Sequence, residues 1–216
     1  MFFDTTTLSE NEMTKKLHYF SGLTITVFVA LHLFNHLISI WGIDGHIETM
    51  TSLRSFYRNT FIEIILLLAV VIQIISGLKL FVDGRRKAVS KLDKLHIWTG
   101  LYLAFFLVIH VAAVMVGRFV LNLDTNFYFG AAGINSFPFN LFFIPYYALA
   151  IVSFFGHIAA IHSKKMKSNI LSLSPEKQAK IILIGGILLT LLIFYGLTNH
   201  FDGIVLPKEY NVLVGR

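Results

Sequence analysis

The sequence predicts an all-α integral membrane protein, a bundle of five transmembrane helices. Of its 216 residues, 56% are hydrophobic and only 14% are charged, whereas soluble domains carry about 25% charged residues. A chain this short could not bury so much apolar surface inside a water-soluble domain. Five apolar stretches also reach the ~20 residues that a helix needs to cross a hydrocarbon layer of ~30 Å.

The five stretches follow one another at short intervals. The second is charged only at Glu63 near its start and Lys79 near its end. The long uncharged stretch 125–163 contains a loop with two prolines, Pro138 and Pro145, and we place the fourth span within this stretch. All five are continuously apolar and too long for barrel strands, which alternate. The predicted spans are Leu17–Ile43, Asn59–Phe81, Leu95–Gly117, Asn140–His162 and Ile181–Phe201.

Lysine and arginine concentrate on one side of this predicted bundle. By the positive-inside rule that side is cytoplasmic, so we expect the N-terminus inside and the C-terminus outside a cell's inner (cytoplasmic) membrane. Basic loops beside anionic lipid then explain the net charge of +6 without a nucleic-acid partner. The cytoplasmic set is Lys15, Lys16, Arg85, Arg86, Lys87, Lys91, Lys94, Lys164, Lys165, Lys167, Lys177 and Lys180, against Arg54, Arg58, Arg118, Lys208 and Arg216 on the other side.

We expect a single domain. Residues 1–16 form a polar cytoplasmic segment, residues 17–201 the five-helix transmembrane bundle, and residues 202–216 a short outer tail. The longest loops, 42–58 and 118–139, are too short for a further domain, so soluble catalytic machinery would belong to partner chains. The sequence contains no cysteine, which excludes iron–sulfur clusters and thiolate chemistry within this chain.

Nine histidines stand out in so apolar a chain, because ionisable residues inside a membrane are costly and commonly functional. Two spans share a pattern: residues 17–22 (LHYFSG) precede His32, and residues 95–100 (LHIWTG) precede His110. At ~1.5 Å per residue, both histidines lie ~22 Å from the cytoplasmic end. Two imidazoles at one depth suit the axial positions of haem b. A zinc site is disfavoured, since no third ligand appears at that depth.

Other histidines leave alternatives open. His36 lies one turn beyond His32 and could replace it as a ligand, or bind a haem propionate or a quinone. His18 and His96 could hold a haem between them, although both are expected at the water interface, where propionates or phospholipid are better partners. The matched pair could also be core histidines with hydrogen-bond partners. Expected at solvated interfaces are His46, His162 and His200.

Two further positions are candidates for cofactor binding. Gln73 in the second span and His157 in the fourth can face each other in the inner half of the bundle, although glutamine is a poor haem ligand. Arg58, with Tyr57 and Glu63 near the outer end of the second span, could bind a propionate or a quinone, or could anchor the helix at the interface.

The order and spacing of these motifs resemble the five-helix cytochrome b membrane anchor of succinate:quinone oxidoreductases (succinate dehydrogenase and fumarate reductase). The similarity runs from about Leu17 to His200. Beyond the repeated histidine motifs, it rests on residues 55–58 (SFYR) leading to residues 63–64 (EI), on Gln73-x-x-x-Gly77, and on His157.

The resemblance implies that His32 and His110 ligate the iron of a distal haem b. It places Gln73 and His157 at the proximal pair, and Gln73 stands where the family has histidine. One complete haem site and a second site lacking a ligand are therefore implied. Quinone as substrate, and flavoprotein and iron–sulfur partners on the cytoplasmic side, are also what the resemblance implies.

We therefore expect a haem b membrane subunit that carries electrons between a succinate/fumarate-type dehydrogenase and membrane quinone, and anchors the dehydrogenase. It would be a non-catalytic or quinone-reactive subunit of an oxidoreductase. The missing ligand at Gln73 favours an alternative, a free-standing single-haem cytochrome b or quinone-linked oxidoreductase. A haem-free transporter or assembly factor is a second alternative, although acidic residues are absent from the middle of the spans.

Overall fold

The computed structural model describes residues 5–216, with side chains from residue 10 onward. This part of the chain is helical and holds no strand beyond an isolated bridge between Ile170 and Leu173. Five of its helices are long and apolar enough to cross a membrane, which confirms that part of the predicted fold class. They are α1 (Thr5–Ile38), α3 (Thr60–Gly84), α4 (Lys91–Phe119), α6 (Asn140–Lys165) and α7 (Pro175–Leu197).

The starts of α4 and α7 follow capping residues rather than hydropathy. At α4 a capping box forms: the Asp93 N–H donates to Ser90 Oγ (3.0 Å) and the Ser90 N–H donates to Asp93 Oδ2 (3.1 Å). At α7 the Ser174 side chain caps the helix and Pro175 takes its first position. The last helix therefore starts before the predicted Ile181. Hydropathy misses its first turns because their residues are polar.

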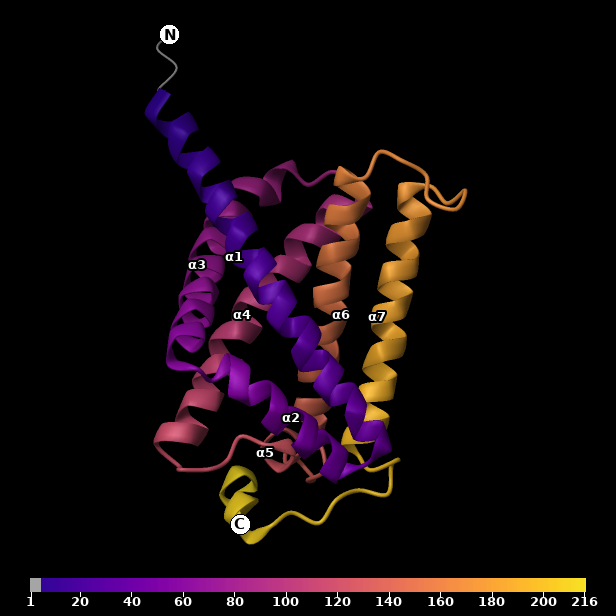
Figure 1. Cartoon of the computed structure of the whole chain (residues 1–216). Coiled ribbons are helices and arrows are strands. Elements are labelled where there is room, and N and C mark those ends of the chain that lie inside the picture. The colour runs from indigo at the N-terminus through magenta and orange to yellow at the C-terminus, as the bar shows by residue number, and fades with distance from the viewer. Residues whose placement is uncertain (1–4) are drawn as a thin grey trace.

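The first membrane helix is longer than predicted and starts at Thr5. Residues 5–16 are therefore the opening turns of α1, which crosses the other helices obliquely (Figure 1). At its far end α1 passes into the short 3-10 helix η1 (Ser39–Trp41). Gly42, with φ of 116°, then turns the chain into α2 (Ile43–Tyr57), a backbone angle that glycine adopts without steric penalty.

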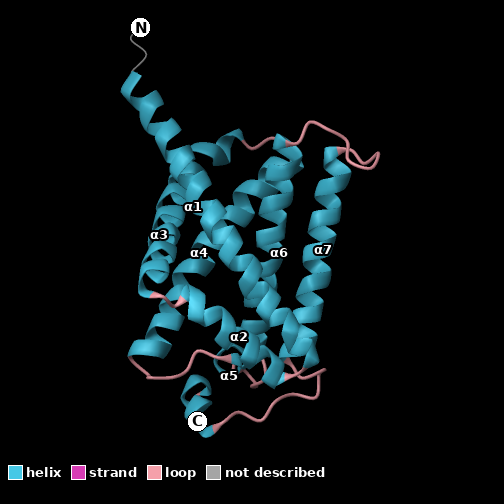
Figure 2. Ribbon diagram, in the orientation of Figure 1, coloured by secondary structure: helices cyan, strands magenta, loops and turns pink. Residues whose placement is uncertain are grey.

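The two long predicted loops contain helices. α2 lies across the end of the bundle where the chain terminates, and α5 (Phe127–Ala131) and the 3-10 helix η3 (Lys208–Val214) lie at the same end (Figures 1 and 2). We call this the capped end. The opposite end, called the N-terminal end, carries the connections at residues 85–90 and 166–174 (Figure 2).

The densest packing is at the capped end and along the contact between α6 and α7. Gly186 of α7 leaves room for the Phe155 ring of α6, and Gly196 lies against the backbone of η1. This packing leaves hollow the space between α1, α3, α4 and α6. The buried apolar cluster at the capped end contains Leu33, Phe127, Ala131, Ile134, Ile151, Ile193 and Leu197.

Candidate functional site

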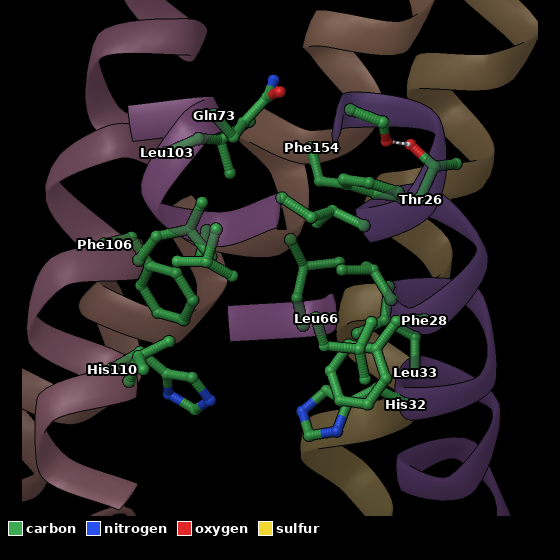
Figure 3. Close-up of a pocket in the computed structure, with 18 of the residues that line it drawn as sticks. Thr26, Phe28, His32, Leu33, Leu66, Gln73, Leu103, Phe106, His110 and Phe154 are labelled. Carbon is green, nitrogen blue, oxygen red and sulfur yellow. Dashed lines mark hydrogen bonds between the residues drawn. The ribbon is translucent and has the colours of Figure 1, made fainter. Parts of the chain in front are cut away.

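A cavity of about 1080 Å³ lies inside the bundle. This volume reaches the top of the roughly 300–1,000 Å³ range of small-molecule and cofactor sites. Its lining runs from Lys15 and His18 at the N-terminal end to Arg58 and Arg118 at the capped end. Apolar side chains such as Leu66 line its middle (Figure 3). The cavity is therefore an apolar chamber with polar groups gathered at its two ends.

His32 of α1 and His110 of α4 point toward each other from opposite walls of this cavity (Figure 3). Their ring centroids are 6.1 Å apart. A metal about 2 Å from one nitrogen of each imidazole would set the two centroids about 6 Å apart. The structure thus brings the predicted ligand pair together at a separation that suits axial ligation from two sides.

Each of these rings stacks on a phenylalanine one turn earlier in its own helix. Phe28 and His32 have centroids 5.8 Å apart and an interplanar angle of 20°, and Phe106 and His110 have centroids 5.0 Å apart and an angle of 14°. The repeat recognised in the sequence therefore includes the residues that orient the two imidazoles. Phe28 and Phe106 each lie four positions before a histidine, a signal that the sequence contained.

A chain of polar contacts continues from His32 toward the capped end. His36 Nε2 is 3.2 Å from His32 Nε2, and His36 Nδ1 is 3.3 Å from His46 Nε2. Asn35 Nδ2 is 3.2 Å from the same His46 nitrogen. His36 is therefore placed to support His32 and to connect it to α2.

The prediction that His46 lies at a solvated interface is wrong. Its side chain is only 1% exposed, with its ring against those of His36 and Phe127. α2 folds over the capped end and turns inward the face that carries His46 and Met50. Burial lowers the pKa of His46 to about 4, with smaller effects from the charges of His32 and Arg54.

Two buried atoms in this region have no hydrogen-bond partner within the described residues, Nδ1 of His46 and Oδ1 of Asn35. Buried polar atoms are rarely left unpaired unless a ligand or water completes them. In the sequence, apolar residues three or four apart between 43 and 57 could have identified this amphipathic helix. The members of that apolar pattern are Ile43, Ile47, Met50 and Leu53.

Within residues 10–216, whose side chains the structure describes, no group of three or more histidine, aspartate or glutamate side chains is arranged to hold a metal ion. That finding bears on sites built wholly from side chains, such as zinc sites with three or four protein ligands. A haem with two axial histidines takes only those two ligands from the protein. His32 and His110 supply that number.

At the N-terminal end of the cavity, Gln73 and His157 both lie in the lining, and each bonds to its neighbouring helix. Gln73 Nε2 is 3.2 Å from His18 Nε2, and Gln73 Oε1 accepts a hydrogen bond from Ser21 Oγ at 2.6 Å. The His157 Nδ1–H donates to the backbone carbonyl of His96 at 3.1 Å. Gln73 and His157 thus both flank the cavity, and His18, which contacts Gln73, lines it as well.

The repeat also extends to the helices that pack beside α1 and α4. Gly22 of α1 lies opposite Gln73, where a Cβ would meet the amide at 3.3 Å, and Gly100 of α4 lies opposite His157, where a Cβ would meet the ring at 3.0 Å. Gln73 on α3 and His157 on α6 therefore occupy equivalent places. Both glycines make room for a polar side chain that a larger residue would displace.

Three arginines gather where the cavity reaches the capped end. Arg54 pairs with Asp124 at 2.6 Å, and Arg118 pairs with Glu63. Arg58 donates to Thr125 Oγ1 at 2.7 Å, and no carboxylate within residues 10–216 pairs with it.

Partial burial, reinforced by the charges of Arg54 and Arg118, lowers the pKa of Arg58. Because a guanidinium stays protonated at physiological pH, Arg58 carries a positive charge that no carboxylate of the described residues neutralises. It lines the cavity at the capped end.

The fold and this cavity together define a helical protein with five candidate membrane spans and a histidine-lined chamber between them. The chain matches no protein-family model, no curated protein and no solved structure. Its function is therefore argued from the residues of the cavity.

Proposed function

We propose that the chain is the haem b-binding membrane subunit of a quinone-linked oxidoreductase. It carries electrons between a succinate/fumarate-type dehydrogenase and membrane quinone, and anchors the dehydrogenase. The observation that carries this proposal is the pair His32 and His110, which face each other across an apolar cavity with ring centroids 6.1 Å apart. Haem supplies a one-electron carrier when bound, and the chain supplies ligands, enclosure and orientation.

The residues present fit such a group in three respects. Haem b is flat and mostly apolar, and the walls around Leu66 and Leu103 are apolar. Two histidines from different helices flank the space, held by stacked phenylalanines. Arg58 offers a positive charge to carboxylates at the capped end. Ligation through His32 Nε2 would replace its present contact with His36 Nε2.

The charge distribution supports a partner at the N-terminal end. Basic residues border this end at 85–87 and 164–167, while the capped end carries the arginines that line the cavity. We infer that the N-terminal end faces the cytoplasm, where flavoprotein and iron–sulfur subunits would dock. Quinone would exchange electrons inside the membrane.

The test is optical and needs no knowledge of the physiological substrate. Protein purified in detergent should show a b-type α-band in its reduced-minus-oxidised spectrum and haem in a pyridine haemochrome assay. His32→Ala and His110→Ala should each abolish the signal of this site. His200→Ala is the matched control, because His200 bonds to the carbonyl of Ile40 outside the cavity lining.

A stable, colourless protein without haem would overturn the proposal, as would a spectrum unchanged in both His32→Ala and His110→Ala. Gentle purification from native membranes addresses the partner. Recovery of a flavoprotein and an iron–sulfur protein in fixed ratio supports the anchor role, whereas recovery of the haem-loaded chain alone supports a free-standing cytochrome b.

A further inference from the structure

We propose that a groove between the first turns of α1 and the last turns of α3 binds the headgroup of a zwitterionic aminophospholipid, phosphatidylethanolamine. The groove holds about 330 Å³ and shares no lining residue with the central cavity. The proposal is therefore independent of the cofactor in that cavity. The groove is lined by Glu10 and Asn11 of α1, Lys79 and Asp83 of α3, and Lys87 of the 3-10 helix η2 (Arg85–Lys87).

The lining carries two positive and two negative charges, so its net charge is zero. Lys79, Asp83 and Lys87 follow one another at intervals of four residues, which places about one helical turn between neighbours. Among residues 10–216, however, no two of the four charged side chains form an ion pair with each other. Four unpaired charges around one groove suit a ligand that carries both signs. Its phosphate would take the lysines and its ammonium the carboxylates.

The groove lies where α3 leaves the apolar layer of the membrane. Asp83 follows Glu63 by 20 residues, about 30 Å of helix, which matches the thickness of a hydrocarbon core. Lys79 lies one turn deeper, and a long side chain can carry its ammonium group back to the interface. Lipid headgroups occupy this same level. A phospholipid is therefore presented to the groove at high local concentration.

An exposed apolar stripe of α3 runs from the groove into the membrane. At about 100° per residue, its four members lie within about 60° of one another, directly beside Lys79 on the helix surface. Their exposed fractions range from 43% to 65%. Acyl chains that lie along this stripe bury apolar surface and hold the headgroup at the groove. The stripe consists of Val71, Ile75, Leu78 and Val82.

α1 supplies the second wall of the groove and is fixed to α3. Asn11, His18 and Ser21 share one face of α1, because residues three or four apart fall on the same side of a helix. Along this face His18 Nδ1 lies 3.0 Å from Ser76 Oγ, and Ser21 Oγ donates to Gln73 Oε1 at 2.6 Å. Those bonds hold the same face toward α3 at Asn11. Its side-chain amide can donate to a phosphate and accept from an ammonium group.

The groups of the groove select among phospholipid headgroups. Phosphatidylglycerol carries a phosphate without an ammonium group, so the two carboxylates would repel it. Phosphatidylcholine carries both charges, but its trimethylammonium group has no N–H to donate to a carboxylate. Phosphatidylethanolamine offers a phosphate to the lysines and three N–H donors to the carboxylates, and charge-assisted hydrogen bonds are the stronger kind. We therefore expect it to be the preferred lipid.

The experiment titrates purified protein in detergent with these three lipids, all with the same acyl chains, and counts bound lipid by native mass spectrometry. Phosphatidylethanolamine should bind one molecule per chain, about fivefold more tightly than the other two. Lys79→Gln combined with Lys87→Gln should weaken its binding about three- to tenfold. Glu10→Gln combined with Asp83→Asn should weaken it similarly and strengthen binding of phosphatidylglycerol. Arg86→Gln is the matched control, because Arg86 is exposed beside the groove but does not line it.

Equal binding of the three lipids by the wild type would overturn the proposal. So would a loss in Arg86→Gln as large as in the double lysine variant, or an unchanged lipid preference after removal of both carboxylates. Glycerophosphoethanolamine, the same headgroup without acyl chains, should not displace the lipid at equal concentration, and displacement would overturn the assignment to a lipid. All four substituted charges are exposed, so the variants should elute as the wild type does. Absence of haem would overturn the proposed function and leave these lipid preferences unchanged.

Discussion

His46 Nε2 lies 3.3 Å from His36 Nδ1. A helix that is not one of the candidate spans therefore reaches into the chamber that the spans enclose. α2 carries His46, and α1 carries His36. The contact explains why α2 crosses the capped end, since it buries a polar side chain against a polar partner. The stability of the capped end should therefore depend on the protonation of His46.

Acid should destabilise the wild-type protein more than His46→Gln. Burial holds the pKa of His46 at about 4, against 6.5 in the unfolded chain. Above pH 6.5 this group is neutral in both states; between about 6.5 and 4 only the unfolded chain binds the proton. Stability then falls by about 2–3 kcal/mol from this group alone. Thermal unfolding in detergent from about pH 7.5 to 4.5 measures the difference, and parallel curves for the two proteins would refute it.

Gly196→Ala should lower the unfolding temperature of the protein strongly. A Cβ there would lie 2.7 Å from the Ile40 backbone nitrogen and 2.8 Å from the Ser39 carbonyl carbon. Backbone atoms cannot move aside by changing rotamer, so we expect a loss of about 1–3 kcal/mol. Gly185→Ala on the same helix is the control, because a Cβ there meets nothing within 4 Å. Equal melting temperatures for the two variants would contradict this packing.

Arg118 and Glu63 should show a measurable coupling energy. They join α4 to α3 with side chains only 19% and 24% exposed, so removing one partner leaves the other charge poorly solvated. We expect Arg118→Gln and Glu63→Gln each to destabilise the protein by about 1–3 kcal/mol, and the double variant by less than their sum. The exposed pair Lys15–Glu12 should show a much weaker coupling, because water screens both charges. Additive losses for Arg118 and Glu63 would show that the ion pair contributes nothing.

The membrane helices could be predicted because the bilayer imposes a length and a hydropathy that few other structures require. The predicted spans Leu95–Gly117 and Asn140–His162 fall within α4 and α6. The repeat that contains His32 and His110 could also be read from the sequence. Two segments with similar sequences form similar helices, so their histidines are expected at the same depth. These features depend on local sequence and on the solvent, and not on how distant parts of the chain meet.

The rest depended on tertiary contacts. His46 is buried only because α2 folds back over α1 and α5; the apolar spacing of residues 43–53 indicates an amphipathic helix but not the surface that covers it. The extent of α1 toward its N-terminal end, to Thr5, does not follow from hydropathy, because its first turns are polar. The contact between His18 and Ser76 joins residues 58 positions apart, beyond what spacing along one helix can show.

The orientation of the chain should be testable with single cysteines, because the sequence has none of its own. Leu171 and Val205 are 90% and 91% exposed and lie in the segments that precede and follow α7, so they are at its opposite ends. We expect a membrane-impermeant maleimide to label Val205→Cys in intact spheroplasts, and Leu171→Cys only after permeabilisation. The reverse pattern would place the N-terminal end outside the cytoplasm and remove the proposed docking side for soluble partners.

If His32 and His110 hold a haem as proposed, Arg58→Gln should lower its midpoint potential. Arg58 lines the cavity at the capped end, and no carboxylate among the described residues pairs with it. Its charge favours the reduced haem, which carries one more electron. A charge about 10 Å away at an effective dielectric of ~20 contributes about 1.7 kcal/mol, or about 70 mV for one electron, so we expect a decrease of about 30–70 mV.

Lys208→Gln is the control for this potential, because Lys208 is exposed on η3 outside the cavity lining. Its removal changes net charge equally but acts through water, where screening weakens it. A selective decrease in Arg58→Gln, measured by spectroscopic redox titration, would place the acidic edge of the cofactor toward the capped end. Equal shifts in both variants, or none in either, would show that Arg58 anchors the interface and that the propionates lie elsewhere.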